Sequence, residues 1–231
     1  MKLNLSGELI PSDWAEVYRK YGYTSGFFCP DDVRNAINSL GPGEELLLEV
    51  NSIGGSVFGG NEIYALIEDC ANPTRAVIQS LAASAASYMI MACDKIEIHL
   101  PAQLMIHRAS TVAWGNAEDL QQAQQMLGVT DNAILDTYCR RCGNKTSRDD
   151  LAEMMASETY IGASDALRYG LVDSIVGGEP NGQNGLLVAS AFNNTVKAMR
   201  TLPDIHELMQ AGKNESDQLR QELENEKNKF I

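Results

Sequence analysis

Basic residues are scarce in this chain. Its 231 residues include 18 lysines and arginines against 31 aspartates and glutamates, so the formal net charge is -13 at pH 7. An excess of negative charge repels phosphate backbones and does not steer a protein toward nucleic acid. The composition therefore argues against DNA or RNA as a partner.

Long apolar runs are also missing. The chain starts with MKLNLSGELIPSDW, which reaches polar residues too soon for a signal peptide. No later stretch approaches the about 20 apolar residues of a membrane-spanning helix. These features predict a cytoplasmic protein that does not bind membranes.

Cysteines are few and show no disulfide framework. Their odd number and scattered positions are typical of free thiols in a reducing compartment. The five are Cys29, Cys70, Cys93, Cys139 and Cys142. The last two have CxxC spacing, but no second CxxC or nearby histidine completes a zinc site, so we expect two helix residues with one facing inward. A metal or redox role for this pair is the weaker alternative, and we expect no cofactor.

Apolar residues make up 44% of the chain, which is enough for one domain with a sizeable core. Residues 43–52, GEELLLEVNS, form an apolar run typical of a strand buried on both faces, and residues 74–81, TRAVIQSL, form a second one. Between them, residues 56–71 carry apolar side chains at helical spacing. A strand, a helix and a strand in this order are almost always parallel in one sheet.

Further elements alternate in the same way, which indicates an α/β fold with helices covering a mostly parallel sheet. Helices are expected at 29–41, 116–143 and 147–156, and strands at 94–100 and 102–107. After residue 177 the composition changes to a turn-rich linker and then a charged segment. We therefore expect one domain over residues 1–177. Residues 178–231 are expected to form a linker and a charged helical or disordered tail, or the start of a scaffold segment.

Three serines lie in the segment QSLAASAASYMIMACDKIEIHLPAQLMIH, which spans residues 79–107. A serine becomes a nucleophile only with a base in reach, an acid behind the base and donors for the oxyanion. Four alanines around Ser84 would let a substrate backbone and the next helix come close, and that helix would point its positive end at the reaction centre. Ser84 is therefore the best candidate, although small residues in a helix also serve packing alone. Ser80 is more typical of a strand end, and Ser87 of packing inside a helix.

Three histidines are available as the base. His107 ends the apolar strand LMIH, and the carboxyl end of a strand is the usual place for function in an open α/β sheet. His99 alternates within a strand and fits a surface position, whereas His206 lies in the linker and tail. His107 is the best candidate, and a purely structural histidine is the alternative.

A second glycine-rich segment, NSIGGSVFGGN, spans residues 51–61. Gly54 and Gly55 follow a buried strand and open a helix, where bare N–H groups can bind an anion. A phosphate loop would need GxxxxGK followed by Ser or Thr, which is absent here, so nucleotide binding is disfavoured. An oxyanion hole is the better use of these glycines, and a plain turn is the alternative.

These segments resemble, in the same order, parts of the proteolytic subunit of Clp protease. NSIGGSVFGGNEIY is similar to its NSPGG segment, SLAASAASYMIMACDKI to its GxAAS nucleophile segment, and LPAQLMIH to its LPxxxxMIH histidine segment. ETYIGASDALRYGLVDSIV resembles the family stretch that ends in GLVD, and the resemblance covers about residues 20–177. NSxGGSVFxG and the glutamate of ETY are more similar still to ClpP-like head maturation proteases of tailed bacteriophages, which trim or degrade scaffold inside an assembling capsid.

The resemblance implies a serine endopeptidase with a catalytic triad. Ser84 matches the nucleophile, His107 the general base, and Glu158 stands in the place of the orienting acid, where the bacterial family has aspartate. Asp165 and Asp173 are the alternatives for that acid, although Asp173 fits better as a residue that caps or turns the chain.

The resemblance also implies oxyanion donors, an assembly and a substrate. The donors would be the N–H of Ala85 together with that of Gly54 or Gly55. Ile53 replaces a family proline and Ser80 a family glycine, which predicts less rigid loops but removes no catalytic group. The long helix corresponds to a protruding handle of the ClpP/crotonase-like fold, so a ring-forming homo-oligomer is expected. The substrate would be a polypeptide, such as a scaffold or capsid protein, in the host cytoplasm within an assembling capsid if the protein is phage-encoded.

Three other functions stay open at this point. A crotonase-like acyl-CoA enzyme would share the architecture and the oxyanion hole but would need neither Ser84 nor His107. A serine-lysine dyad would use Lys95 as its base and leave His107 without a role. A catalytically inactive protease fold would serve capsid assembly alone.

Overall fold

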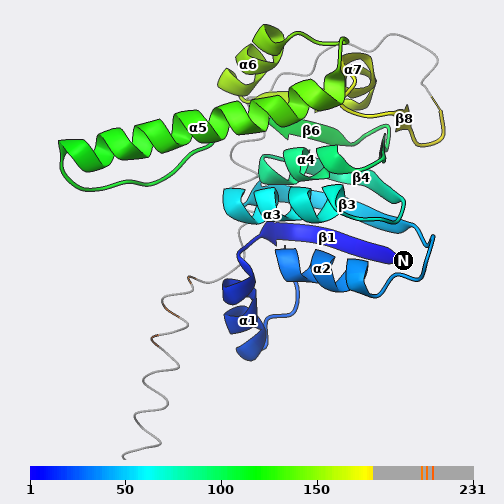
Figure 1. Ribbon diagram of the computed structural model, residues 1–231, viewed down its shortest axis with the longest axis horizontal. Coiled ribbons are helices and arrows are strands. Elements are labelled where there is room, and N and C mark those ends of the chain that lie inside the picture. The colour runs from blue at the N-terminus through cyan, green and yellow to red at the C-terminus, as the bar shows by residue number, and fades with distance from the viewer. Residues whose placement is uncertain (179–203, 205–206, 208–209, 211–231) are drawn as a thin grey trace, which may run out of the picture.

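The computed structural model describes residues 1–178 and the positions 204, 207 and 210 (Figure 1). Its elements in chain order are β1 (Lys2–Leu9), α1 (Ser12–Lys20), β2 (Phe27–Phe28), α2 (Pro30–Asn38), β3 (Leu46–Gly55), α3 (Val57–Glu68), β4 (Thr74–Ala83), α4 (Ala85–Met89), a 3-10 helix (Ile90–Ala92), β5 (Lys95–Ile98), β6 (Gln103–Ile106), α5 (Ala117–Cys142), α6 (Arg148–Ala156), β7 (Thr159–Gly162), α7 (Ala163–Tyr169) and β8 (Ser174–Ile175). Nearly all of the expected linker and tail over 178–231 lies outside the described residues.

The strands form one mostly parallel sheet, as the sequence predicts. Its order is β2-β1-β3-β4-β5-β8, and every pair along this path is parallel. β4 has two partners on one side: its first half pairs with β5 and its last three residues pair with β6. β7 then adds to β6 in the antiparallel direction. This division of β4 places the end of β6 beside the end of β4.

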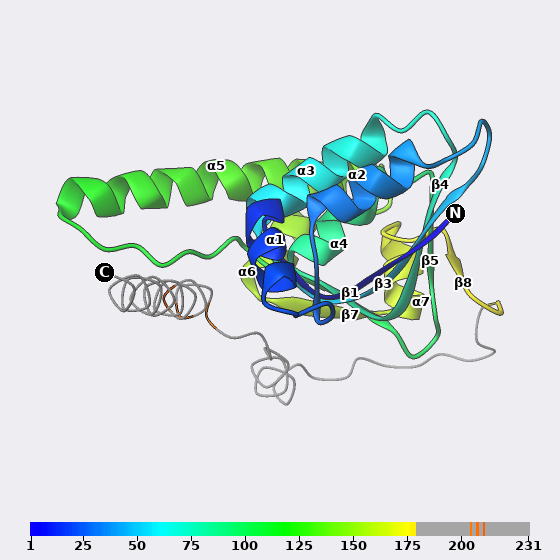
Figure 2. The ribbon, with the colours of Figure 1, turned by 90° about the horizontal axis from the view of Figure 1, so that it is seen from below.

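Helices cover the sheet and build one large core with it. Figure 2 shows α2, α3 and α4 together on one side of the strands. The core cluster draws buried side chains from all three of these helices, from β1, β3, β4, β5 and β6, and from the last part of α5. The α/β class with covering helices is therefore confirmed. β3 differs in one respect from the expectation of two buried faces, because only alternate residues of it are fully buried.

Local sequence explains where several of these helices begin. Ser56 starts α3 by accepting a hydrogen bond from the N–H of Gly59, and Ser147 starts α6 in the same way through Asp150. Pro30 occupies the first turn of α2, where its missing N–H costs nothing. The elements β1, α1, β2, β7, α7 and β8 were not predicted. β1 in particular exposes or half-buries most of its side chains, so its apolar pattern is weak even though it lies inside the sheet.

The helix α5 protrudes from the domain, as the expected handle does (Figure 1). Asn116 and Asp119 cap its start reciprocally, and Gly143 ends it with a positive φ of 57°. At 26 residues it is about 39 Å long, given a rise of about 1.5 Å per residue. Its buried residues all lie in its last third, on one face: Ile134, Leu135, Tyr138 and Cys142. Figures 1 and 2 both show the chain before it running alongside its exposed first half.

No helix within the described part of the chain combines the length and the apolar character needed to cross a bilayer. The longest, α5, carries charged and amide side chains along most of its length. The five cysteines are all free thiols, and Cys139 and Cys142 are α5 residues of which only Cys142 is buried, as expected.

Candidate active site

Ser84 and His107 are brought together by the pairing of β4 with β6. Ala83 and Met105 are partners at the carboxyl ends of these parallel strands, and the N–H of Ser84 donates to the carbonyl of Met105 at 2.9 Å. Ser84 follows the last residue of β4 and His107 follows the last residue of β6, so the two lie side by side. Nε2 of His107 lies 2.6 Å from Oγ of Ser84, within hydrogen-bond distance. This is the geometry that a base needs in order to take a proton from a hydroxyl.

Ser84 sits on a sharp turn between β4 and the short helix α4. Its φ is 53° and its ψ is -127°, a combination that residues with a side chain rarely adopt. Strain of this kind is characteristic of a serine presented on a strand-to-helix turn. Ala83, Ala85 and Ala86 are buried around it, as the alanine-rich sequence predicts.

Glu158 faces His107 across the antiparallel pair of β6 and β7. Ile106 is the partner of Thr159, so the next pair in this register joins His107 and Glu158. Oε1 of Glu158 lies 3.9 Å from Nδ1 of His107, which is too far for a hydrogen bond. The Glu158 side chain is 57% exposed, whereas that of His107 is 19% exposed. The carboxylate is on the correct side of the imidazole and would need only a small movement to bind it, and such bonds often tighten when a substrate is present.

The two alternative acids are engaged elsewhere. Asp165 forms an ion pair with Arg168 one turn along α7. Asp173 accepts the N–H of Ile96 at 2.7 Å and forms an ion pair with Arg141. Asp173 therefore joins the turn before β8 to β5, in agreement with the structural role expected for it.

A carboxylate that the sequence analysis missed also lies near His107. Oδ1 of Asp131, on α5, accepts the N–H of Ala109 at 2.7 Å and so holds the chain two residues beyond the imidazole. Burial lowers the pKa of His107 below its ordinary value, while the charges of Glu158 and Asp131 act in the opposite direction. Burial therefore favours the neutral imidazole, which is the form that can accept a proton. No local pattern marks Asp131, because its contact depends on how α5 docks.

The two glycines after β3 have different environments. The N–H of Gly54 donates to Oγ of Ser52 at 3.0 Å, so it is already engaged. Gly55 lines a pocket of about 50 Å³ together with Ser84, His107 and Tyr138. Of the two glycines, Gly55 is thus the better placed as an oxyanion donor, and Gly54 serves the close approach of β3 to the turn at Ser84.

Other sequence candidates are not part of this cluster. His99 follows β5, where its N–H donates to the carbonyl of Ile78, and His206 lies outside the described residues. Ser80 is an exposed residue within β4 and not at its end.

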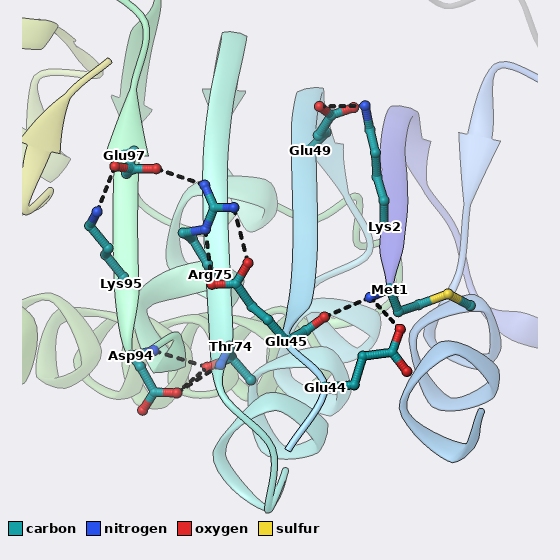
Figure 3. A network of polar contacts seen from close by, with 10 residues as sticks. All are labelled: Met1, Lys2, Glu44, Glu45, Glu49, Thr74, Arg75, Asp94, Lys95 and Glu97. Atoms are coloured by element: carbon teal, nitrogen blue, oxygen red, sulfur yellow. Dashed lines mark hydrogen bonds and ion pairs between the residues drawn. The ribbon is translucent and has the colours of Figure 1, made fainter. Parts of the chain in front are cut away.

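Lys95 does not come near Ser84. It starts β5, pairs in register with Arg75 near the beginning of β4, and forms an ion pair with Glu97. Figure 3 shows it within a surface network of charged residues that joins the beginnings of neighbouring strands. Ser84 follows the opposite end of β4, so the structure contradicts the serine-lysine dyad. The described residues contain no group of three or more His, Cys, Asp and Glu side chains that could hold a metal ion.

Comparisons with known proteins agree with the resemblance. A family model described as Clp protease matches residues 35–179. The ATP-dependent Clp protease proteolytic subunit of Deinococcus radiodurans is 29% identical over 143 residues, which cover 61% of this chain and 69% of that protein. The residues matched by the family model include Ser84, His107 and Glu158.

Proposed function

Since the chain belongs to the Clp protease family, we propose that it is a serine endopeptidase that cleaves peptide bonds through Ser84, His107 and Glu158. The observation that carries this proposal is the 2.6 Å contact between Oγ of Ser84 and Nε2 of His107. The strained turn at Ser84 and the lowered pKa of His107 support the same roles. A crotonase-like function would give no reason for this contact.

Peptide cleavage would proceed in two steps. His107 takes the proton of Ser84 while the hydroxyl oxygen attacks the peptide carbonyl, and then returns that proton to the leaving amine. Water, activated by the same imidazole, hydrolyses the acyl-enzyme and restores Ser84. Glu158 closes on Nδ1 of His107 and stabilises the imidazolium that forms in each step.

The negative oxygen of the tetrahedral intermediate needs donors. The N–H of Ala85, which follows the nucleophile, and the N–H of Gly55 are assigned to this role. Gly55 lines the same pocket as Ser84, whereas the N–H of Gly54 is bound to Ser52. Losing one such donor typically costs about 10²- to 10³-fold in turnover.

A fluorophosphonate probe tests the chemistry directly. The probe should label Ser84 in the purified chain, and the label should disappear in Ser84→Ala and in His107→Ala but persist in Lys95→Ala. Absence of label from the folded parent chain would refute the endopeptidase and leave the inactive, structural alternative.

The substrate proposed for the protease is a scaffold or capsid protein of a tailed bacteriophage during head maturation. This assignment is supported by the NSxGGSVFxG and ETY segments, which are similar to those of phage proteases. Incubation with the scaffold protein of such a phage should yield discrete fragments with the parent chain and none with Ser84→Ala. An intact scaffold in both reactions would contradict this substrate.

A ring-forming homo-oligomer is the proposed assembly. Large apolar side chains are exposed along α5 and the segment before it, where solvent contact is unfavourable. They are Val112, Trp114, Leu120, Met126 and Val129. Light scattering should give a mass that is a multiple of the chain mass, and a monomer at all concentrations would contradict the proposal.

A further inference from the structure

Ser87, one turn beyond the nucleophile, binds the carbonyl of Ser84 twice. Its N–H donates to that oxygen at 2.9 Å, and its Oγ donates to the same oxygen at 2.6 Å. Ser87 is completely buried, so water cannot replace either bond. The expectation that Ser87 packs inside the helix is right for its position but omits this contact.

Tyr138 extends the chain of hydrogen bonds to α5. Its hydroxyl lies 2.6 Å from Oγ of Ser87, and its side chain is 1% exposed. A serine hydroxyl has one proton, and Ser87 uses it on the carbonyl of Ser84, so the hydroxyl of Tyr138 is the donor in this pair. Burial raises the pKa of Tyr138 far above its ordinary value, which keeps that proton in place.

The carbonyl of Ser84 and the N–H of Ala85 belong to the same peptide group. Hydrogen bonds accepted by the carbonyl draw electron density toward its oxygen and make the N–H a stronger donor, because the peptide is conjugated. They also restrain the plane of the peptide and thus the direction of the N–H. Tyr138, Ser87 and this peptide therefore form one relay that ends at a proposed oxyanion donor.

Simple packing does not explain two buried hydroxyls here. Alanine and phenylalanine would fill the same space without removing two polar groups from water. Only four buried residues are polar or charged in the part of the chain that the structure describes, and Ser87 is one of them. A pair of hydroxyls that ends at the peptide of the proposed nucleophile, within a mostly apolar core, indicates a function beyond filling space.

We propose that Ser87 and Tyr138 are positioning residues that orient and polarise the peptide between Ser84 and Ala85 and so strengthen the oxyanion hole. This inference rests on the proposed endopeptidase function. Tyr138 lies in the buried last third of the protruding helix α5, so the proposal connects that end of the helix to catalysis.

Hydrolysis of p-nitrophenyl acetate tests the relay, because this ester needs the nucleophile, the base and the oxyanion donors but no peptide subsites. In Ser87→Ala and Tyr138→Phe, kcat/KM should fall about 3- to 30-fold, which is less than the 10²- to 10³-fold cost of removing an oxyanion donor outright. The double variant should be no slower than Ser87→Ala, because Tyr138 acts only through Ser87. The midpoint of the pH profile of kcat/KM should stay that of the parent, since no hydrogen bond joins either hydroxyl to His107.

Thr146→Val is the matched control for losing a buried hydroxyl. The Thr146 hydroxyl donates to the carbonyl of Tyr169 at 2.9 Å, outside the site. This variant should lose stability, measured by thermal unfolding, but keep the parent kcat/KM. A parent-like kcat/KM in folded Ser87→Ala and Tyr138→Phe would overturn the relay, and so would a shifted pH midpoint, which would indicate a displaced imidazole.

Ser84→Ala separates the two proposals. If Ser84→Ala hydrolyses the ester as fast as the parent, the proposed function itself fails. If Ser84→Ala is inactive while Ser87→Ala and Tyr138→Phe match the parent, only the relay fails.

Discussion

Replacing Gly54 by alanine should disturb the turn that presents Ser84. A Cβ atom at this position would lie 2.7 Å from the carbonyl oxygen of Ala83, 2.7 Å from Cβ of Ser84 and 2.9 Å from the nitrogen of Ala85. All three distances are shorter than any ordinary contact, and two of the three atoms are backbone atoms that cannot rotate away. The φ of Gly54 is also +89°, which is unfavourable for a residue with a side chain.

Two unfavourable contributions to the folding free energy add in Gly54→Ala. The positive φ costs about 1–2 kcal/mol for an L residue. Forcing a methyl group into a filled space costs a further 1–3 kcal/mol, roughly, because neighbouring atoms must move. The atoms that move carry the nucleophile, and a displacement of about 1 Å at a reacting group can reduce turnover by about 10²-fold.

Gly43→Ala is the matched control, because it carries the first cost without the second. The φ of Gly43 is +76°, and a Cβ atom there meets nothing within 4 Å. Urea unfolding should therefore show a loss of about 1–2 kcal/mol for Gly43→Ala and a clearly larger loss for Gly54→Ala. The rate of fluorophosphonate labelling at Ser84 should fall in Gly54→Ala alone.

Equal behaviour of the two variants would contradict this prediction. If Gly54→Ala loses no more unfolding free energy than Gly43→Ala and labels at the parent rate, then the close approach of β3 to the turn at Ser84 has no energetic consequence. If Gly54→Ala labels more slowly than the parent but loses no more unfolding free energy than Gly43→Ala, the added methyl group still disturbs the turn at Ser84.

Two further predictions concern Glu158 and Asp173, two of the candidates for the acid of the proposed triad. The charge of Glu158 raises the pKa of His107, so Glu158→Gln should lower that pKa further and move the acid limb of kcat/KM to lower pH, while the maximal rate falls because the imidazole loses its orienting partner. An acid limb that stays in place or moves to higher pH would contradict this electrostatic assignment. Asp173→Ala should leave the N–H of Ile96 without its acceptor and the guanidinium of Arg141 with only the carbonyl of Cys93. The unfolding free energy should fall by roughly 1–3 kcal/mol, with a lower melting temperature and a parent-like ester hydrolysis rate in the folded protein. Loss of hydrolysis in folded Asp173→Ala would instead make Asp173 the triad acid.

The sequence pattern alone does not determine how close Glu158 comes to His107, and the folded chain sets this distance at 3.9 Å. The resemblance places an acid at position 158, but a glutamate is one methylene longer than the family's aspartate, and its side chain here is largely exposed. The register of the antiparallel pair of β6 and β7 determines which acid faces His107, because it places residue 158 opposite residue 107. Neither Asp165 nor Asp173 has such a position relative to the imidazole.

The sequence by itself determined the elements whose signals are local. Apolar periodicity and turn residues act between near neighbours, so β3, α3, β4, α5 and α6 could be predicted from their own residues. The alanines around Ser84 likewise marked the turn of the proposed nucleophile, and the apolar strand before His107 marked the proposed base.

Only the tertiary structure decided which residues meet. The contact of Ser84 with His107 spans 23 positions and that of Ser87 with Tyr138 spans 51, and both depend on the strand order and on the docking of α5. No local pattern carries that information, because the pairing of β4 first with β5 and then with β6 results from burial of the whole core. For the same reason, the engagement of the Gly54 N–H by Ser52 and the contact of Asp131 with Ala109 became visible only in the folded chain.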